Sequence, residues 1–330
     1  VYKFNMKILA IQNRMGIGDT VIFLPFIKAL SEKFNSPISL LVKKSSKADQ
    51  YLHQTDYIDK VLFLDEEKKE DGNRNSFFEN LELIKNIKKY NFEKIFIFNS
   101  SLRYNLIAKL SGIQEIHQYP LFQKKNQHII KAAQNFIKET LGVEIESNPI
   151  VEVNENEIKD TKNKYDIDNE NLNILLGTGG SGPNKRISAK VYKSVIEMCT
   201  TKYKCRFFIA TGKNDEEQKI LDEIVNNNIN NFTKLDDLSI SEIIPIIKCC
   251  TLSICNDTSF SHLSSALGLE TIILFADTAT LYGSYNSKMH PITPDNNFYK
   301  DKNLMPKDKI NPKIVFNKFE EILFKLNLSK

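Results

Sequence analysis

The stretch NDTSFSH at residues 256–262 places an acid, a histidine and several hydroxyls directly after the apolar run TLSIC. If TLSIC is a strand and a short helix follows from Ser259, with Gly268 as its cap, these side chains lie at a strand end and a helix start. Free N–H groups at a helix start bind anions, and Asp257 and His262 can hydrogen-bond the hydroxyls of a polar ligand. We therefore predict a ligand site. The alternative is that Asp257 and Ser259 only cap the helix and that His262 is a core histidine.

A second loop, GTGGSGPNKRIS, follows the apolar run NILLG. It contains G-x-G-x-x-G at Gly177, Gly179 and Gly182, a pattern typical of dinucleotide sites. No acidic residue ends the next apolar run, FFIAT, and Gly182 is not followed by the Lys-Ser/Thr pair of a Walker loop. What remains is a donor-rich loop whose cations, Lys185 and Arg186, suit phosphate oxygens. The alternative is a solvated loop with surface charges.

A third loop, NRMGIGDT, follows the first apolar run. Gly16 and Gly18 would allow a tight turn in which the backbone approaches a ligand, and Asp19 stands at a helix start. Asp19 is either a helix cap or a reactive acid. An acid in the first half, with a cation and an anion-binding helix in the second, suits deprotonation of a nucleophile and departure of a diphosphate.

Alternating strand-like and helix-like runs through both halves predict parallel βαβ units in two open α/β sheets, with ligands at the carboxyl ends of the strands. The length of 330 residues also favours two domains. The polar stretch 148–173 separates the halves, and an S-x-x-E capping box at Ser239 and Glu242 marks one helix start. Asn311 as a cap with Pro312 in the first turn predicts a closing helix.

Composition restricts the partners. Lys and Arg number 45 against 41 Asp and Glu, a net charge of +4, and the charges are interspersed, which does not indicate a nucleic-acid binder. The balance is compatible with anionic small molecules or an anionic membrane surface. The stretch TVIFLPFIKAL is shorter than the ~20 residues of a membrane span, and no signal-peptide pattern precedes it. The cysteines lie in or beside apolar runs, as expected of reduced core residues in a cytosolic protein.

Three stretches, MKILAIQNRMGIGDTVIFLPFIKAL, GTGGSGPNKRIS and NDTSFSHLSSALG-x-x-TIILF, resemble in order and separation glycosyltransferase family 9, the ADP-heptose lipopolysaccharide heptosyltransferases. The resemblance implies a GT-B fold: two Rossmann-like parallel-sheet domains that face a central cleft. Residues 1–160 would bind the acceptor and residues 161–310 the nucleotide-sugar donor. The closing helix, residues 311–330, would pack back on the N-terminal domain.

The implied reaction is an inverting transfer of a sugar, heptose, from an ADP-sugar to a lipopolysaccharide core or related cell-surface glycan, without metal or cofactor. The implied partners are a nucleotide sugar and a lipid-linked or oligosaccharide acceptor, with no nucleic acid. The enzyme would be cytoplasmic, in peripheral contact with the inner membrane. The D-x-D at Asp166 and Asp168 is the metal signature of a different glycosyltransferase fold, and we interpret it as incidental in its polar connector.

The resemblance also assigns residues. Asp19 matches the acid of the G-D-x-x-x-x-x-P motif, the general base that takes the acceptor proton. Lys185 matches the lysine that holds the donor phosphates, and Thr178 a neighbouring phosphate contact. The remaining assignments are the D-T-x-x-x-H donor motif at Asp257, Thr258 and His262, with Ser259 beside it; the loop glycines Gly16, Gly18 and Gly179; and contacts to an anionic acceptor by Ser100 and Arg103.

Three departures from the family pattern leave the sugar and base preference open. Ser259 stands where the family has glycine, Ile187 replaces an aromatic residue, and Ala276, Asp277 and Thr278 replace Gly-Pro-Thr. The alternatives are a glycosyltransferase with another nucleotide sugar, an NAD-dependent oxidoreductase, and a non-catalytic nucleotide-sugar binding protein.

Overall fold

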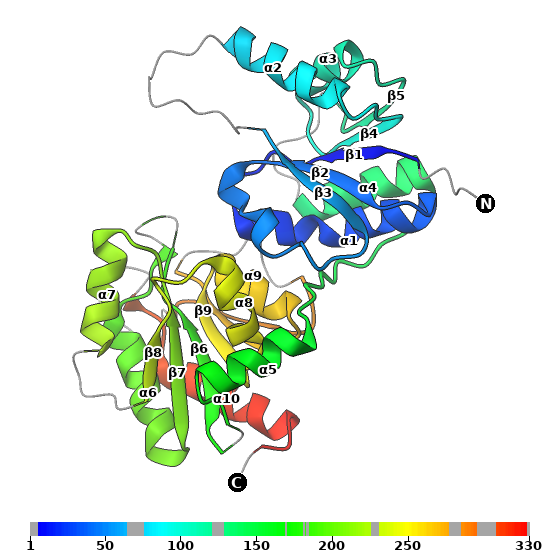
Figure 1. Cartoon of the computed structure of the whole chain (residues 1–330). Helices are drawn as coiled ribbons and strands as arrows, with labels where there is room; N and C mark the ends of the chain where they lie inside the picture. The colour runs from blue at the N-terminus through cyan, green and yellow to red at the C-terminus, as the bar shows by residue number, and fades with distance from the viewer. Residues whose placement is uncertain are drawn as a thin grey trace. The chain divides into compact units, whose positions relative to one another are not determined.

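The computed structural model of the chain describes residues 6–64, 76–120, 129–168, 170–180, 182, 185–225, 231–276, 285–295 and 308–328. The chain forms two compact units, Val1–Glu152 and Val153–Lys330 (Figure 1). Their boundary precedes the one predicted at residue 160. Among the described residues, no helix combines the length and hydropathy needed to span a membrane.

The first unit is a parallel sheet with strand order β3-β2-β1-β4-β5. Its strands are β1 (Ile8–Ile11), β2 (Ile38–Val42), β3 (Ile58–Phe63), β4 (Lys94–Ile97) and β5 (Glu115–Gln118). Its helices are α1 (Ile17–Phe34), α2 (Ser76–Lys88), α3 (Leu102–Leu110) and α4 (Ile129–Leu141), with short 3-10 helices at Lys44–Ser46 and Ala48–Gln50. Helices α1 and α4 pack together on one face of the sheet, and α2 and α3 on the other (Figure 1). Because both faces are covered, the central strands are continuous apolar runs.

The second unit is a parallel sheet with strand order β11-β10-β9-β6-β7-β8. Its strands are β6 (Leu172–Gly177), β7 (Cys205–Ala210), β8 (Phe232–Lys234), β9 (Leu252–Asn256), β10 (Glu270–Leu274) and β11 (Met289–Ile292). Its helices are α5 (Glu155–Lys164), α6 (Ala189–Lys202), α7 (Asp215–Val225), α8 (Ile240–Lys248), α9 (Ser259–Ala266) and α10 (Pro312–Lys325). The closing helix α10 packs on α6 of this unit. Its predicted contact with the N-terminal domain stays a prediction.

Each sheet has a point at which the order of its strands reverses, between β1 and β4 in the first unit and between β6 and β9 in the second. Helices that leave such neighbouring strands go to opposite faces, so the loops at their carboxyl ends border a crevice. The loops NRMGIGDT and GTGGSGPNKRIS follow β1 and β6, and NDTSFSH includes the end of β9. The fold therefore places all three chemistry-bearing stretches at reversal points.

Local signals predicted most of these elements. The capping box of α8 is confirmed, with the Ser239 N–H donating to Glu242 Oε2 at 2.9 Å, and Asn311 caps α10. Helix α1 begins at Ile17 and continues through Pro25. Sequence reasoning missed α4 and the strands β5, β8 and β11, which lie at or near sheet edges and carry polar residues or, in β11, a proline.

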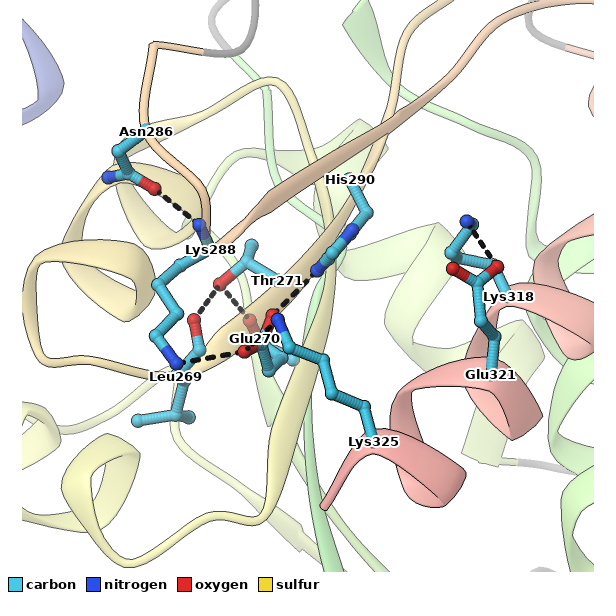
Figure 2. A network of polar contacts seen from close by, with 10 residues as sticks. Leu269, Glu270, Thr271, Asn286, Lys288, His290, Lys318, Glu321 and Lys325 are labelled. Carbon is cyan, nitrogen blue, oxygen red and sulfur yellow. Dashed lines mark hydrogen bonds and ion pairs between the residues drawn. The ribbon is translucent and has the colours of Figure 1, made fainter.

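A buried carboxylate joins three elements of the second unit (Figure 2). Glu270 at the start of β10 is 2% exposed and accepts hydrogen bonds from Lys288 at 2.8 Å, His290 at 2.7 Å and Lys325 at 3.0 Å. Burial alone would raise the pKa of Glu270, but the hydrogen bonds from the three partners outweigh it and lower the pKa to about 2. The cluster thereby ties α10 and the edge strand β11 to β10.

Replacing Glu270 with glutamine should lower the free energy of unfolding by about 1–3 kcal/mol at neutral pH, because Lys288 and Lys325 lose a buried anion while both lysines stay partly hydrated. Urea unfolding measures the difference. Glu321→Gln, which removes an exposed ion pair with Lys318 nearby, is the matched control and should change stability little. Equal losses in the two variants would contradict the role given to Glu270.

The contribution of Glu270 should also depend on pH. Its folded-state pKa of about 2 lies below the unfolded value of about 4.3. A carboxyl with a lowered folded-state pKa stabilises the fold above the unfolded value and loses that contribution as the pH falls toward the folded value. The stability gap between wild type and Glu270→Gln should therefore be full above pH ~4.5 and shrink toward pH ~2. A gap that stays constant over this range would argue against the ion-pair origin.

Candidate functional site

The stretch NDTSFSH folds as the sequence predicts. Strand β9 ends at Asn256, and Thr258 is the N-cap of α9 with an extended backbone. Ser261 fixes this cap, because its hydroxyl donates to Thr258 O at 2.7 Å and accepts from the Thr258 N–H at 3.3 Å. Ser259 is the first residue of α9 and is half-buried. The N-terminal N–H groups of α9 therefore lie at the carboxyl edge of the sheet, where a helix dipole favours an anion.

Three residues predicted to bind the nucleotide-sugar donor lie together beside this helix start. Lys185 Nζ donates to Asp257 Oδ2 at 3.0 Å, and Asp257 Oδ1 lies 3.8 Å from His262 Nε2. The other ring nitrogen of His262, Nδ1, is hydrogen-bonded to the Tyr285 hydroxyl at 2.9 Å, and the two rings stack at 7°. We call Lys185, Asp257, His262 and Tyr285 the Lys-Asp-His cluster. The core-histidine alternative is correct in that His262 is buried with a satisfied nitrogen, but its second nitrogen faces Asp257.

Charges in this cluster are set by burial and by pairing. Burial raises the pKa of Tyr285 well above that of a free tyrosine, and the nearby Asp257 adds to this, so the phenol keeps its proton near neutral pH. A carboxylate beside Nε2 favours the histidine tautomer with its hydrogen there. The cluster thus offers one cation and an acid-histidine pair within reach of the same helix start. Sequence reasoning missed Tyr285, which lies far from the motif in the chain.

Asn256 holds the glycine-rich loop against the end of β9. This fully buried side chain donates to Thr178 O at 2.8 Å and Gly179 O at 3.0 Å, and its own oxygen accepts from the Tyr192 hydroxyl at 2.8 Å. Thr178 is fully buried too, and its hydroxyl has no hydrogen-bond partner within the described residues. Its predicted phosphate contact stays a prediction. Asn256 is a positioning residue that sequence reasoning missed, although it directly precedes Asp257.

The glycines of the loop admit close contacts. A Cβ on Gly177 would lie 2.6 Å from Cys255 Sγ, and one on Gly179 would lie 2.9 Å from Glu217 Oε1. Both distances are shorter than side chains tolerate, so these glycines let the loop approach β9 and α7. Close packing therefore explains glycine at these two positions, whereas a Cβ on Gly182 would meet no described atom within 4 Å.

Glu217 and Arg186 hold the same loop from the other side. The buried carboxylate of Glu217 accepts the Gly180 N–H at 2.6 Å and the amide of Asn214. Arg186 Nε donates to Gly180 O at 3.1 Å, and its guanidinium pairs with Glu216. Of the two cations expected to bind phosphate, Arg186 is thus committed to loop structure, while Lys185 pairs with Asp257 at the start of α9. Sequence reasoning sought an acid at the end of β7 and missed Glu217 in the first turn of α7.

In the first unit, Asp19 lies in the first turn of α1. Its Oδ2 accepts the Gly16 N–H at 3.0 Å, so the capping interpretation is correct, and its proposed role as a base stays a prediction. Gly16 is the N-cap of α1 with an extended backbone at φ −101°, and a Cβ there would crowd the Asp19 carboxylate at 3.2 Å; its predicted approach to a ligand stays a prediction. Gly18 is buried within the same first turn. Asp19 itself is half-buried.

A polar network joins the ends of β1, β4 and β5 near Asp19's loop. Asn99 Nδ2 donates to Asn13 Oδ1 at 2.9 Å, and Gln118 Nε2 donates to Asn99 O at 3.0 Å and Ser101 O at 2.8 Å. Sequence reasoning missed these amides. Ser100 lies half-buried within the segment that they hold.

Arg103, the second predicted acceptor contact, is exposed in the first turn of α3. Its Nε donates to Asn80 of α2 at 2.7 Å. The guanidinium is therefore oriented by α2, beside the segment that contains Ser100. The acceptor roles of both residues stay predictions.

The D-x-D pattern has a structural role. Asp168 Oδ1 accepts hydrogen bonds from the backbone of Glu170 and from the backbone and side chain of Asn171, which stabilises a turn before β6. In the part of the chain that the structure describes, no group of three or more His, Cys, Asp or Glu side chains is arranged to hold a metal ion.

Comparisons with known proteins agree with this arrangement. The family model of glycosyltransferase family 9 (heptosyltransferase) matches residues 98–308. A family 9 glycosyl transferase from Veillonella parvula superposes with a TM-score of 0.80 at 15% identity, covering 98% of this chain and 99% of that one. The ADP-heptose lipopolysaccharide heptosyltransferase II of E. coli gives 0.74 at 15% identity, covering 98% and 100%.

A third similar structure is the E. coli heptosyltransferase WaaC with ADP, with a TM-score of 0.70 at 13% identity and coverage of 96% of this chain and 100% of that one. A search of curated proteins found no match. The family match spans more than half of the chain, and the structural matches share its two parallel-sheet α/β domains. The chain belongs to glycosyltransferase family 9 and is a glycosyltransferase with a GT-B-like fold.

Proposed function

We propose that this enzyme transfers heptose from ADP-heptose to a lipopolysaccharide core or related cell-surface glycan, with inversion and without a metal or cofactor. The observation that carries the proposal is the Lys-Asp-His cluster at the N-terminus of α9, where a cation, a helix start and an acid-histidine pair converge. The structural relatives named above include heptosyltransferases, one with ADP, which supports the choice of sugar and nucleotide. The proposed location is the cytoplasmic face of the inner membrane.

On the donor side, Lys185 and the N-terminus of α9 would hold the diphosphate. Both carry positive charge or partial charge, so both interact more strongly with the diphosphate as its negative charge grows during bond cleavage. Asp257 and His262 would accept and donate hydrogen bonds to hydroxyls of the donor. Pairing with Asp257 fixes the direction of the Lys185 side chain before the ligand arrives, which lowers the entropic cost of binding.

On the acceptor side, Asp19 would act as general base. The acceptor hydroxyl would give its proton to the carboxylate while its oxygen attacks the anomeric carbon, and the bond from that carbon to the diphosphate oxygen would break on the opposite face. Capping of α1 by Asp19 holds the carboxylate in one orientation. The amides around Asn99 and Gln118, together with Ser100 and Arg103, would contact the acceptor.

Thermal unfolding with a ligand panel tests the donor assignment, because a ligand that binds the native state raises the midpoint. ADP should raise the midpoint, and ADP-heptose should raise it further at equal concentration. A larger shift with UDP, GDP or CMP would keep the glycosyltransferase but reject the ADP-sugar. A shift with NAD alone would favour the oxidoreductase. A dinucleotide site would need an acid at the end of β7, but the nearby acid Glu217 lies in α7 and accepts the Gly180 N–H.

Lys185→Ala should weaken ADP binding by about 10- to 100-fold, because a charge-assisted hydrogen bond to phosphate is lost. Lys185→Arg keeps the charge and should lose less. Isothermal titration with ADP measures both. The matched control is Lys190→Ala, which removes an exposed lysine of the adjacent α6 and should leave affinity unchanged. An unchanged affinity in Lys185→Ala would remove Lys185 from the phosphate site.

Asp19→Asn should lower kcat by about 10²- to 10⁴-fold while leaving the ADP-induced thermal shift intact, because the amide oxygen can still cap α1 but cannot take a proton. Single-turnover transfer to a lipopolysaccharide core acceptor measures the rate. Glu32→Gln, an exposed carboxylate near the end of the same helix, is the control and should keep full activity. A rate within about threefold of wild type would reject the base role.

A further inference from the structure

Helix α3 presents apolar residues on two opposite faces. Tyr104 and Ile107 are buried against the unit, as expected of a helix that covers a sheet. Leu102, Leu106 and Leu110 are instead 66%, 58% and 55% exposed. Their spacing of four residues places them in one row along the helix. A single exposed leucine is ordinary, but a row of three on a nine-residue helix is a feature that calls for a partner.

Helix α2, which lies beside α3, also carries exposed apolar residues (Figure 1). Arg103 at the start of α3 hydrogen-bonds Asn80 of α2, and Ser111 after its end contacts Ile84 O at 3.4 Å. The two helices are therefore neighbours along their length. Asn80 is flanked in α2 by Phe78 and Leu81, which are also exposed. We call Phe78, Leu81, Leu102, Leu106 and Leu110 the α2/α3 face.

Cations accompany this face. Arg103 and Lys109 adjoin the leucines of α3 in sequence and are exposed. The last turn of α2 and the residue after its end add three further exposed lysines: Lys85, Lys88 and Lys89. Against them, α2 carries the acids Glu79 and Glu82. An apolar row with an excess of positive charge complements an anionic lipid surface, whose acyl region takes the leucines and whose headgroups attract the cations.

We propose that the α2/α3 face docks the enzyme on a bilayer that contains anionic lipids. The inference rests on the proposed function in one respect, that the acceptor is lipid-linked. Helix α3 begins directly after Ser100 and Ser101, in the segment held by Asn99 and Gln118, so docking through α3 brings the predicted acceptor residues to the membrane surface.

A second copy of the chain fits this face less well. An isologous dimer would place the same patch against itself. The cations around the leucines would then meet their own copies, and like charges at close range oppose association. Anionic headgroups remove that repulsion, which is why the charge pattern favours lipid.

Sedimentation with vesicles tests the proposal on the purified full chain. The vesicles are phosphatidylethanolamine with phosphatidylglycerol at about three to one, and phosphatidylcholine alone serves as the neutral comparison. Wild type should bind the anionic vesicles, more weakly at high salt, and bind phosphatidylcholine at least about tenfold less. The variant Leu102→Ser/Leu106→Ser/Leu110→Ser should lose about tenfold or more in binding. Because these positions are exposed, the variant should keep its melting temperature.

A charge variant and a matched apolar control complete the design. Lys88→Glu/Lys109→Glu should weaken binding to anionic vesicles only. Ile314→Ser/Phe324→Ser removes exposed apolar side chains from α10 in the other unit and should bind as wild type does. No binding of wild type to anionic vesicles, or an equal loss in the α10 control, would overturn the proposal. So would a concentration-dependent dimer that the leucine variant abolishes in the absence of vesicle binding, since the face would then belong to a second copy.

The thermal shift with ADP and ADP-heptose, measured on the same samples, separates this proposal from the proposed function. Vesicle binding without a nucleotide shift would reject the donor and keep the membrane face. A nucleotide shift without vesicle binding would reject the membrane face and keep the donor.

Discussion

The side chain of Asn256 is the interaction on which the donor site depends. A buried amide must satisfy its donors and its acceptor, and Asn256 does so with the carbonyls of Thr178 and Gly179 and with the Tyr192 hydroxyl. These bonds link the last residue of β9 to the loop after β6, across the point where the strand order reverses. The start of the loop that leads to Lys185 is therefore fixed before any ligand binds, and Lys185 meets Asp257, the residue after Asn256. Without this link, the two loops would share an edge of the sheet but no defined geometry.

The charged residues around the glycine-rich loop have two different roles. Glu217 and Arg186 hold the backbone of the loop, whereas Lys185 pairs with a residue outside it. Glu217 and Arg186 are buried or nearly so. Glu217 accepts from the Gly180 N–H and from Asn214, Arg186 donates to Gly180 O and pairs with Glu216, and Arg186 Nε lies 3.9 Å from Glu217 Oε1. Leaving either one unpaired would cost more than the pair contributes, so they act as fixed structure. Lys185 is more exposed than Arg186, and its partner Asp257 lies at the helix start. Lys185 and Arg186 are thus adjacent in sequence but have different physical roles, and the sequence alone does not distinguish them.

Sequence reasoning was strongest where a local rule applies. The apolar runs, the Ser239 and Asn311 caps and the start of α9 each depend on a few adjacent residues, and the structure confirms them. The pairing of Lys185 with Asp257 was not predicted, because it depends on β6 and β9 being neighbours in the sheet, which no local pattern specifies. Tyr285 could not be predicted, since nothing local connects it to His262. Edge strands such as β8 and β11 were missed because, being short and partly polar, they lack the apolar run of a central strand.

Stability and chemistry occupy opposite edges of the second sheet. Glu270 pairs in register with Leu252 at the start of β9, whereas Asn256 pairs with Leu274 at the end of β10. Four residue steps of about 3.3 Å separate the two edges. The ion cluster at Glu270 can therefore hold α10 and β11 in place without placing its cations near a bound diphosphate. At the carboxyl edge the reverse requirement applies, because a cation saturated by protein carboxylates could not respond to charge that develops on a leaving group. Lys185, whose carboxylate partner is Asp257, lies at the carboxyl edge, whereas Glu270 and its partners Lys288, His290 and Lys325 lie at the opposite edge.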